Sequence, residues 1–245
     1  MNKVLITLPC YNEELVLEKT VVAVRAYAQK HLADFVCTIL ILDNNSSDGT
    51  RAIADRLATE YPNEVRVTSV SEPGRGVALR VAWAREDGFD IYAYMDTDLA
   101  TNIKDFRTLV TKVREGYDFV TGSRYIRESD VERNPKREIL SRIYNLLLKL
   151  ILRVSFRDAQ CGFKAMSARL VRELVPKTRD AGWFWDTELM ILASRGGYRV
   201  LEIPVSWREV RDEVRKSKVS HWKESVRQLK NIWEMRRRLK KNYEK

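Results

Sequence analysis

The chain has 245 residues, 44% of them hydrophobic and 32% charged, with a net charge of +10. This length and composition suit one large soluble domain, or one domain with an appended element, with a sizeable core, and they exclude a disordered or fibrous chain. The charge is uneven, because eleven Lys/Arg and three Asp/Glu follow from Lys216 onward. A basic tail of this kind suits either nucleic acid or anionic lipid.

Other functional classes are excluded by the cysteines and the hydropathy. Cys10, Cys37 and Cys161 are too widely spaced for a CxxC metal pattern or a disulfide framework, which fits a reducing compartment. No stretch reaches the roughly 18 uncharged apolar residues that span a bilayer. We expect no removable signal sequence, since residues 1–9 already form an apolar strand pattern.

The first 125 residues predict alternating strands and helices. Short apolar runs predict strands at 4–8, 38–42, 65–70, 91–95 and 118–121. The intervening segments predict helices: one capped by Asn12 that carries Leu15, Val22 and Ala26, one from the Asp48–Gly49 turn through Tyr61, and others at 78–86 and 106–114. This order predicts an α/β fold with a mostly parallel sheet.

Polar and glycine residues follow each predicted strand. They are residues 9–13, Asp43, residues 72–76, residues 96–98 and residues 122–124. Ligands of such sheets bind at the carboxyl ends of the strands. The sequence therefore predicts a binding site along this edge.

Two later segments predict amphipathic helices. In residues 139–156 a narrow polar stripe of Arg142, Asn145, Lys149 and Arg153 faces an otherwise apolar surface, so this helix is either a core helix with one wet edge or partly immersed in lipid. From His221 a basic helix carries an apolar face, which suits the headgroup region of an anionic bilayer. That face consists of Trp222, Val226, Leu229 and Trp233.

Asp96–Thr97–Asp98 follows a predicted strand and is the most pointed chemical feature. Two carboxylates at this spacing can hold Mg²⁺ or Mn²⁺ with coordination positions left for diphosphate oxygens. Asp43 has two interpretations, a helix cap or an acceptor for a base or ribose, and Ser46, Ser47 or Asp48 fills the capping role better. Residues 73–76 predict a loop with a cation before a helix N-terminus, which suits phosphate but also occurs in plain turns.

Together these segments resemble the ordered motifs of family 2 glycosyltransferases, and within them the dolichyl-phosphate mannose and dolichyl-phosphate glucose synthases. The resemblance covers roughly residues 3–220, and the QCGFK motif of residues 160–164 is its most specific part. The matching segments are PCYNE at 9–13, residues 43–50, GRG at 74–76, DTDL at 96–99, GSRY at 122–125, RDAQCGFK at 157–164, WDTEL at 185–189, IPVSW at 203–207 and Ser217–Lys218.

The resemblance implies a GT-A fold and roles for individual residues. Asp96 and Asp98 would hold Mg²⁺ or Mn²⁺ on the diphosphate, while Arg124, Arg137 and Ser141 would bind the acceptor phosphate. Lys218 would close over the donor from a mobile loop. The full expected donor site comprises Pro9, Tyr11, Glu13, Asp43, Arg75, Asp96, Thr97, Asp98, Arg124 and Lys218.

The sequence departs from the family pattern at several positions. Thr97 and Ala100 stand where mannose synthases often have Ala and Gln, so a third side-chain metal ligand is not expected. Arg75 stands where Lys is usual, and in the longer, more charged segment 211–216 either Arg211 or Arg215 could reach the donor. Asp186 and Glu188 are either catalytic carboxylates or structural partners of Arg157 or Lys164, and we favour the structural role. Cys161 is expected to be a small buried residue.

The function that the resemblance implies is inverting transfer of a hexose from GDP-mannose or UDP-glucose to a polyprenyl or dolichyl phosphate. It implies a peripheral enzyme at the cytoplasmic face of a membrane, with a GT-A domain at 1–215, an interfacial acceptor helix at about 137–156 and a basic amphipathic helix at 216–245. The sequence identifies neither the sugar nor a membrane-anchoring partner. Two alternatives are a family 2 enzyme with a soluble or protein acceptor, and a basic nucleic-acid-binding module. Acids at the ligand edge argue against nucleic acid.

Overall fold

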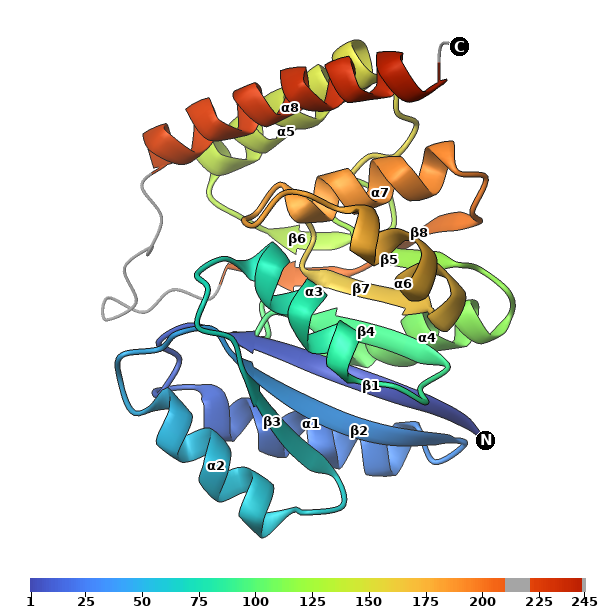
Figure 1. Cartoon of the computed structure of the whole chain (residues 1–245). Helices are drawn as coiled ribbons and strands as arrows, with labels where there is room; N and C mark the ends of the chain where they lie inside the picture. The colour runs from blue at the N-terminus through green and yellow to red at the C-terminus, as the bar shows by residue number, and fades with distance from the viewer. Residues whose placement is uncertain (210–220, 244–245) are drawn as a thin grey trace.

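The computed structural model describes residues 1–209 and 221–243, except for the side chains of 136–137, 221–226 and 241–243. Its centre is a seven-stranded sheet in the order β3-β2-β1-β4-β7-β5-β8 (Figure 1). The strands are β1 (Asn2–Cys10), β2 (Phe35–Asp43), β3 (Val65–Ser69), β4 (Ile91–Met95), β5 (Phe119–Ser123), β7 (Phe163–Ser167) and β8 (Val200–Pro204). Only β7 is antiparallel to its neighbours in this sheet, so the expected α/β fold with a mostly parallel sheet is confirmed.

Helices cover both faces of the sheet. One face carries α1 (Leu17–His31), α2 (Thr50–Glu60) and α4 (Phe106–Arg114), and the other carries α3 (Arg75–Arg85), α6 (Ala168–Leu174) and α7 (Trp185–Arg195). Beyond α7, the helices α5 (Pro135–Leu152) and α8 (His221–Tyr243) lie side by side (Figure 1). The remaining elements are the short sheet of β6 (Asp130–Glu132) and β9 (Ser206–Arg208) and the 3-10 turns η1 (Ile103–Asp105) and η2 (Val175–Lys177).

Two hydrophobic cores fix the position of the binding edge. Leu5, Leu40 and Trp83 belong to the core beneath α3, α6 and α7, and Leu148 and Ile232 bring α5 and α8 into the same core. The second core lies beneath α1, α2 and α4. Because β1, β2 and β4 are buried from both sides, their carboxyl ends are held in register at one edge.

The first helix differs from its prediction. Asn12 has a left-handed backbone (φ 54°), and its side-chain oxygen accepts the N–H of Ser47 instead of capping a helix. The helix begins at Leu17, so Leu15 precedes it and Val22 faces solvent. The Asn12 cap and the predicted apolar face are therefore wrong. The loop before α1 instead serves to connect β1 to the loop after β2.

Helix α5 presents apolar side chains to the outside. Asn145, Leu148 and Leu152 face the core. The helix ends at Leu152, four residues before its predicted end, and Arg153 after it has a left-handed backbone (φ 51°). A core helix with one wet edge is therefore not what the structure shows. We define the apolar surface as the exposed residues Ile139, Leu140, Ile143, Leu146 and Leu150 of α5 with Leu229 and Trp233 of α8.

The apolar surface does not amount to a membrane span. Among the described residues, no helix combines the length and the apolar character needed to cross a bilayer.

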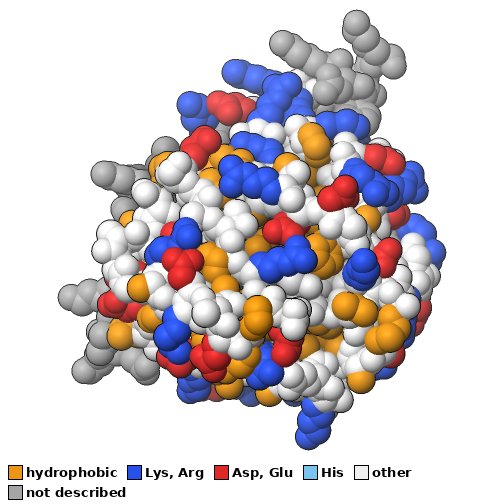
Figure 2. Space-filling view, turned by 60° about the horizontal axis from the view of Figure 1, so that its bottom comes forward, with side chains coloured by type: hydrophobic (Ala, Val, Ile, Leu, Met, Phe, Trp, Pro, Cys, Tyr) orange, Lys and Arg blue, Asp and Glu red, His pale blue; other side chains and the backbone are white. Residues whose placement is uncertain are grey.

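On the face that Figure 2 presents, Lys/Arg and Asp/Glu side chains are interspersed over most of the area. The basic excess seen in the sequence is therefore not spread over this face as a field of one sign.

Candidate functional site

The segments after β1 and β2 meet at the carboxyl edge of the sheet, as predicted. The N–H of Asn12 donates to Ser46 Oγ (3.0 Å), and the N–H of Glu13 donates to Thr50 Oγ1 (2.7 Å). Pro9 is half-buried near the end of β1, and Tyr11, just after the strand, is about half exposed. Three of the predicted donor-site residues, Pro9, Tyr11 and Glu13, are thus held beside the Asp43 loop.

Asp43 is buried at the last position of β2. One carboxylate oxygen accepts the N–H of Ser46 (3.3 Å) and the other accepts the hydroxyl of Ser69 (3.3 Å). The N-cap of α2 is Gly49, which makes no side-chain cap bond, and Asp48 just before it accepts the N–H of Thr50 through Oδ1 (3.0 Å). Asp43 therefore does not cap α2, and both its contacts are with neutral donors at the binding edge.

Thr97 anchors the backbone between Asp96 and Asp98, the two residues of the acid pair. Its side chain is buried and its hydroxyl donates to the carbonyl of Pro9 (3.0 Å), while its own carbonyl accepts the hydroxyl of Thr20 (2.6 Å). With Thr97 turned inward, the side chains of Asp96 and Asp98 on either side remain partly exposed. Thr97 therefore positions the two carboxylates while its side chain points away from them.

The acid pair has the donor set that a hard divalent cation needs. The Asp96 side chain is 40% exposed, and Asp98 Oδ1 accepts the N–H of Ala100 (3.0 Å). Partial desolvation of its carboxylate by the surrounding groups and the neighbouring Asp98 carboxylate raise the pKa of Asp96, although Arg75 opposes this shift. No group of three or more potential metal ligands occurs among residues 1–209 and 221–243. A cation here would thus have two protein carboxylates and would take its other oxygens from diphosphate or water.

Arg75 supplies the positive charge at this edge. Its Nη2 lies 3.0 Å from Asp96 Oδ1, and its guanidinium lies 4.9 Å from the Tyr94 ring and 5.0 Å from the Trp183 ring. The side chain is buried, its Nε has no hydrogen-bond partner, and Nη2 faces Asp96 as an ion pair without hydrogen-bond geometry. The N–H groups of Gly76 and Val77 both donate to the carbonyl of Ala181. The predicted loop with a cation before a helix start is therefore present, and the group that it offers is the Arg75 side chain, because the N–H groups of Gly76 and Val77 are already bonded.

Gly162 of the QCGFK motif lies against Asp96. Its carbonyl accepts the N–H of Asp96 (3.0 Å), and a Cβ at position 162 would overlap the Asp96 carboxylate. The neighbouring Lys164 is fully buried and donates to the carbonyls of Ala159 and Cys161. Cys161 is buried as expected, and burial raises the pKa of its thiol to about 12. The motif is thus a framework that supports the acid pair.

We expect Gly162→Ala to lower transfer activity by about a hundredfold, because the Asp96 carboxylate must leave its position. The measurements are kcat and the Kd for Mn²⁺. Gly88→Ala is the control, since its Cβ meets no atom within 4 Å and its left-handed φ strains only the backbone far from this edge. Full activity and unchanged Mn²⁺ affinity in Gly162→Ala would show that Asp96 does not hold the metal.

Arg124 is held by a buried carboxylate at the end of β5. Its backbone N–H, Nε and Nη2 donate to Asp158 at 3.0, 2.7 and 2.9 Å, and the Asp158 side chain is fully buried. The Arg124 guanidinium lies 5.7 Å from the Trp207 ring. Asp158 and Gly162 belong to one short segment, so this segment connects Arg124 to Asp96.

Arg124 lines a basic hollow of about 380 Å³ beside the start of α5. Arg133 and Arg142 pair with its carboxylate, Glu138, and the Arg142 guanidinium lies 5.2 Å from the Tyr125 ring. Ser141 lies close enough to Tyr125 to lower the pKa of the Tyr125 hydroxyl, although burial raises that pKa overall. We define the basic hollow by its lining residues, which are Arg124, Tyr125, Ile126, Arg127, Ser129, Val131, Arg133, Glu138 and Arg142.

The structure therefore brings two of the three predicted acceptor residues, Arg124 and Ser141, to one place. Arg137 lies in the first turns of α5, but its side chain is outside the described parts of the chain, as are Lys218, Arg211 and Arg215. Sequence reasoning missed Arg127 and Arg133. Arg127 precedes β6 and Arg133 directly follows it. The pairing of β6 with β9 is long-range, so the only local signal for these two arginines is their closeness to Arg124 in the chain.

The two acids of α7 are held by contacts within the fold, and the structural role that we favour stays a prediction. Asp186 is buried and accepts the hydroxyl of Tyr94, and Glu188 accepts the N–H groups of Arg179 and Asp180 and pairs with Arg238. Neither the Arg157 nor the Lys164 partnership was found among the described contacts. Their partners come instead from β4, from helix α8 and from the loop that precedes α7.

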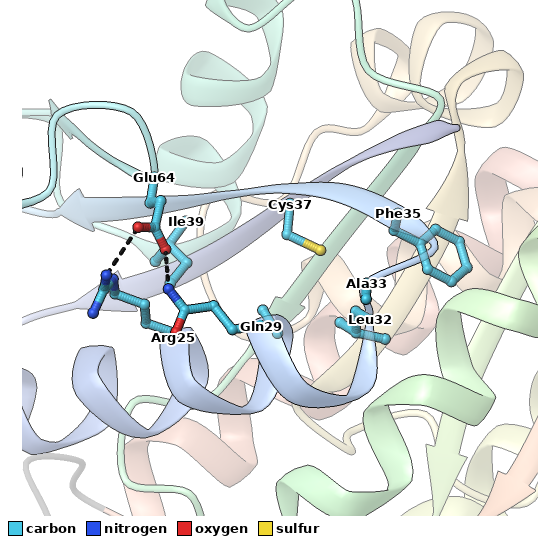
Figure 3. A pocket seen from close by; sticks show the side chains of 9 residues that line it. Arg25, Gln29, Leu32, Ala33, Phe35, Cys37, Ile39 and Glu64 are labelled. Atoms are coloured by element: carbon cyan, nitrogen blue, oxygen red, sulfur yellow. Dashed lines mark hydrogen bonds and ion pairs between the residues drawn. The ribbon is translucent and has the colours of Figure 1, made fainter.

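A smaller hollow of about 160 Å³ lies between α1 and the start of β2 (Figure 3). Arg25 and Gln29 both bind Glu64 there, at 3.0 and 3.1 Å. Burial raises the pKa of the Cys37 thiol to about 11. Phe35 and Cys37 open β2, so this hollow lies at the opposite end of the strand from Asp43 and is not part of the candidate site.

The fold and the site together define an α/β protein with a metal-capable acid pair and a basic hollow at the carboxyl edge of its sheet. The sequence profile of glycosyl transferase family 2 matches residues 5–175, so the chain belongs to this family and is a glycosyltransferase. The resemblance inferred from the motifs is confirmed.

Three relatives illustrate the range of the family. Glycosyltransferase AglD of Haloferax volcanii is 40% identical over 206 residues, which cover 84% of this chain and 33% of that protein. Dolichyl-phosphate beta-glucosyltransferase ALG5A of Trichomonas vaginalis is 29% identical, with 84% and 65% covered. Polyprenol monophosphomannose synthase of Mycolicibacterium smegmatis is 29% identical, with 97% and 89% covered. The chain thus spans a third of the first and just under two thirds of the second.

The fold is also that of a solved glycosyltransferase. Glucosyl-3-phosphoglycerate synthase from Mycobacterium tuberculosis, in complex with Mn²⁺ and UDP-glucose, superimposes with a TM-score of 0.69 at 22% identity. The match covers 96% of this chain and 79% of that one. The expected GT-A fold is thereby confirmed.

Proposed function

We propose that this glycosyltransferase transfers a hexose, with inversion, from GDP-mannose or UDP-glucose to a polyprenyl or dolichyl phosphate at a membrane surface. The observation that carries the proposal is the position of the basic hollow. It lies at the start of α5, whose exposed residues Ile139, Ile143 and Leu146 make up much of the apolar surface. An acceptor with a phosphate head and an isoprenoid chain matches this pairing of arginines with exposed apolar side chains.

The names of relatives support both the acceptor and the two sugars. One relative is a dolichyl-phosphate beta-glucosyltransferase and another a polyprenol monophosphomannose synthase. The acid pair fits a divalent cation, and the solved neighbour contains Mn²⁺ with UDP-glucose. We therefore propose Mg²⁺ or Mn²⁺ as cofactor, held by Asp96 and Asp98, with the nucleotide lying along Pro9, Tyr11, Glu13 and Asp43.

The chemistry demands positioning and charge neutralisation more than a strong base. A phosphate acceptor is already ionised at neutral pH, so its oxygen can attack the anomeric carbon without proton abstraction by the protein. A bound divalent cation would stabilise the negative charge of the departing nucleoside diphosphate. Arg124, fixed by Asp158, would orient the acceptor phosphate, and Arg75 would lie close to the diphosphate.

The remaining assignments extend this proposal. Arg137 and Ser141 would complete the acceptor site, and Lys218 would reach the donor from the segment after β9. The glycosyltransferase domain would comprise residues 1–215, and the helix within 216–245 would rest with α5 on the membrane, making the protein peripheral. A nucleic-acid-binding role is disfavoured, because Asp43, Asp96 and Asp98 lie along the ligand edge, where a polyanion is repelled.

A radiolabel transfer assay tests the proposal. The purified chain is combined with Mn²⁺, a short polyprenyl phosphate and, in turn, labelled GDP-mannose, UDP-glucose and UDP-GlcNAc. Label that enters the organic phase with GDP-mannose or UDP-glucose supports the proposal and identifies the sugar. Binding of a nucleotide-sugar without any lipid product would overturn the lipid acceptor and favour a soluble or protein acceptor.

The acceptor part predicts an unusual gain. The Glu138 carboxylate is negatively charged and cannot itself bind a phosphate. It lies 2.6 Å from Arg142 Nε and 3.8 Å from Arg133, so it competes with the acceptor phosphate for both arginines. We expect Glu138→Gln to lower the KM for polyprenyl phosphate about threefold to tenfold while the donor KM is unchanged. Glu132→Gln is the control, since Glu132 pairs with Arg208 outside the hollow. A raised acceptor KM in Glu138→Gln would mean that Glu138 holds the arginines in place for the phosphate.

A further inference from the structure

Polar contacts fasten helix α8 to the segment 177–188, which runs from η2 into α7. Asn231 Nδ2 donates to Asp180 Oδ2 (2.8 Å), and Arg238 pairs with Glu188 and donates to the carbonyl of Lys177 (2.7 Å). The Arg238 and Glu188 side chains are only 16% and 4% exposed. Contacts of this kind within a buried boundary fix position, because neither charge can be left without its partner.

The same segment grips the start of α3 from the other side. The carbonyl of Ala181 accepts the N–H groups of Gly76 (2.9 Å) and Val77 (3.1 Å), and the carbonyl of Thr178 accepts Arg80 Nη1 (3.1 Å). A Cβ on Gly76 would come within 2.5 Å of Trp185 Cβ. No space separates the two elements, so a shift of the segment would move the start of α3 with it.

The start of α3 carries Arg75, and the segment carries Trp183. The Arg75 guanidinium lies between the Tyr94 and Trp183 rings and makes the ion pair with Asp96. Its Nε is buried beside the acid pair without a hydrogen-bond partner, and its Nη2 faces Asp96. An uninterrupted series of contacts therefore runs from α8 through Asp180 and Ala181 to Arg75 and Asp96.

We propose that α8 is part of the donor site, with Asn231 and Arg238 as positioning residues that hold Arg75 against Asp96. This inference rests on the proposed donor site at Asp96 and Asp98. Arg75 and Asp96 are placed before the ligand arrives, so the metal and the diphosphate meet a cation and a carboxylate at fixed positions. Neither positioning residue touches the ligand, and each acts through the segment 177–188.

The test is calorimetric binding of UDP and GDP, each with Mn²⁺, to the full chain and its variants. We expect Arg238→Ala and Asn231→Ala to weaken binding of the preferred nucleotide about tenfold, and Arg238→Lys to recover part of the loss. The KM for polyprenyl phosphate should remain unchanged. Arg237→Ala is the matched control, because this substitution removes the same charge from an exposed position on the same helix.

The outcomes separate the two levels of the argument. If Asn231→Ala and Arg238→Ala both bind the nucleotide as tightly as wild type does, the role of α8 is overturned and the proposed function still stands. Equal losses in donor binding and acceptor KM would also overturn it, since they indicate general loosening of the fold. Absence of nucleotide binding by wild type would instead overturn the proposed donor site. Asn231→Ala keeps the test decisive if Arg238→Ala does not fold.

Discussion

Replacing Asp98 by Asn is expected to reduce glycosyl transfer by at least about a hundredfold with little change in stability. The Asp98 side chain is partly exposed, and its Oδ1 accepts the N–H of Ala100, a hydrogen bond that the Asn amide oxygen can keep. The lost charge matters at the metal, because only Asp96 then remains as an anionic protein ligand. The readouts are kcat/KM for label transfer and the Kd for Mn²⁺, with circular dichroism to confirm the fold.

Asp55→Asn is the matched control for this prediction. Asp55 is an exposed acid on α2 that pairs with Arg51, so its loss removes the same charge without touching the acid pair. Transfer at the wild-type rate by Asp98→Asn would remove the divalent cation from the proposed chemistry. A parallel loss in Asp55→Asn would mean that net charge, and not metal ligation, controls the rate.

Local patterns predicted the sheet edge well. The run of apolar residues before Asp43 and before Asp96 gave the ends of β2 and β4 correctly, and the helix at 106–114 has the predicted bounds. These features follow from the period of hydrophobic residues, which a sequence displays directly. Once the strands are parallel, their carboxyl ends must meet, and the site follows from that geometry.

Features that depend on long-range pairing could not be predicted. The antiparallel strand β7 lies between β4 and β5. This order brings Gly162 into contact with Asp96, and Asp158 into contact with Arg124. Nothing in the local sequence says which strand separates two others. The apolar residues of α5 were equally ambiguous, because a helix periodicity does not say which side the protein covers.

Asp158→Asn is expected to lower the free energy of unfolding by about 3–5 kcal/mol, the largest stability effect among our predictions. The Asp158 carboxylate accepts three N–H groups of Arg124, whose guanidinium is only 8% exposed. An Asn side chain leaves that guanidinium buried without a neutralising charge. Because Arg124 also lines the basic hollow, the KM for polyprenyl phosphate should rise as well.

The pH dependence of this loss distinguishes the ion pair from a packing defect. Burial acts against the Asp158 charge, but Arg124 outweighs it and holds the pKa of the carboxyl below its ordinary value. The stabilisation is therefore fully present above the unfolded pKa of about 4 and is lost as the pH falls through the lower folded value. Denaturant unfolding at pH 7 and at pH 3 should show a smaller difference between wild type and Asp158→Asn in acid. A difference that stays constant across this range would assign the loss to packing, and Asp130→Asn, which breaks an exposed pair with Arg208, should change little at either pH.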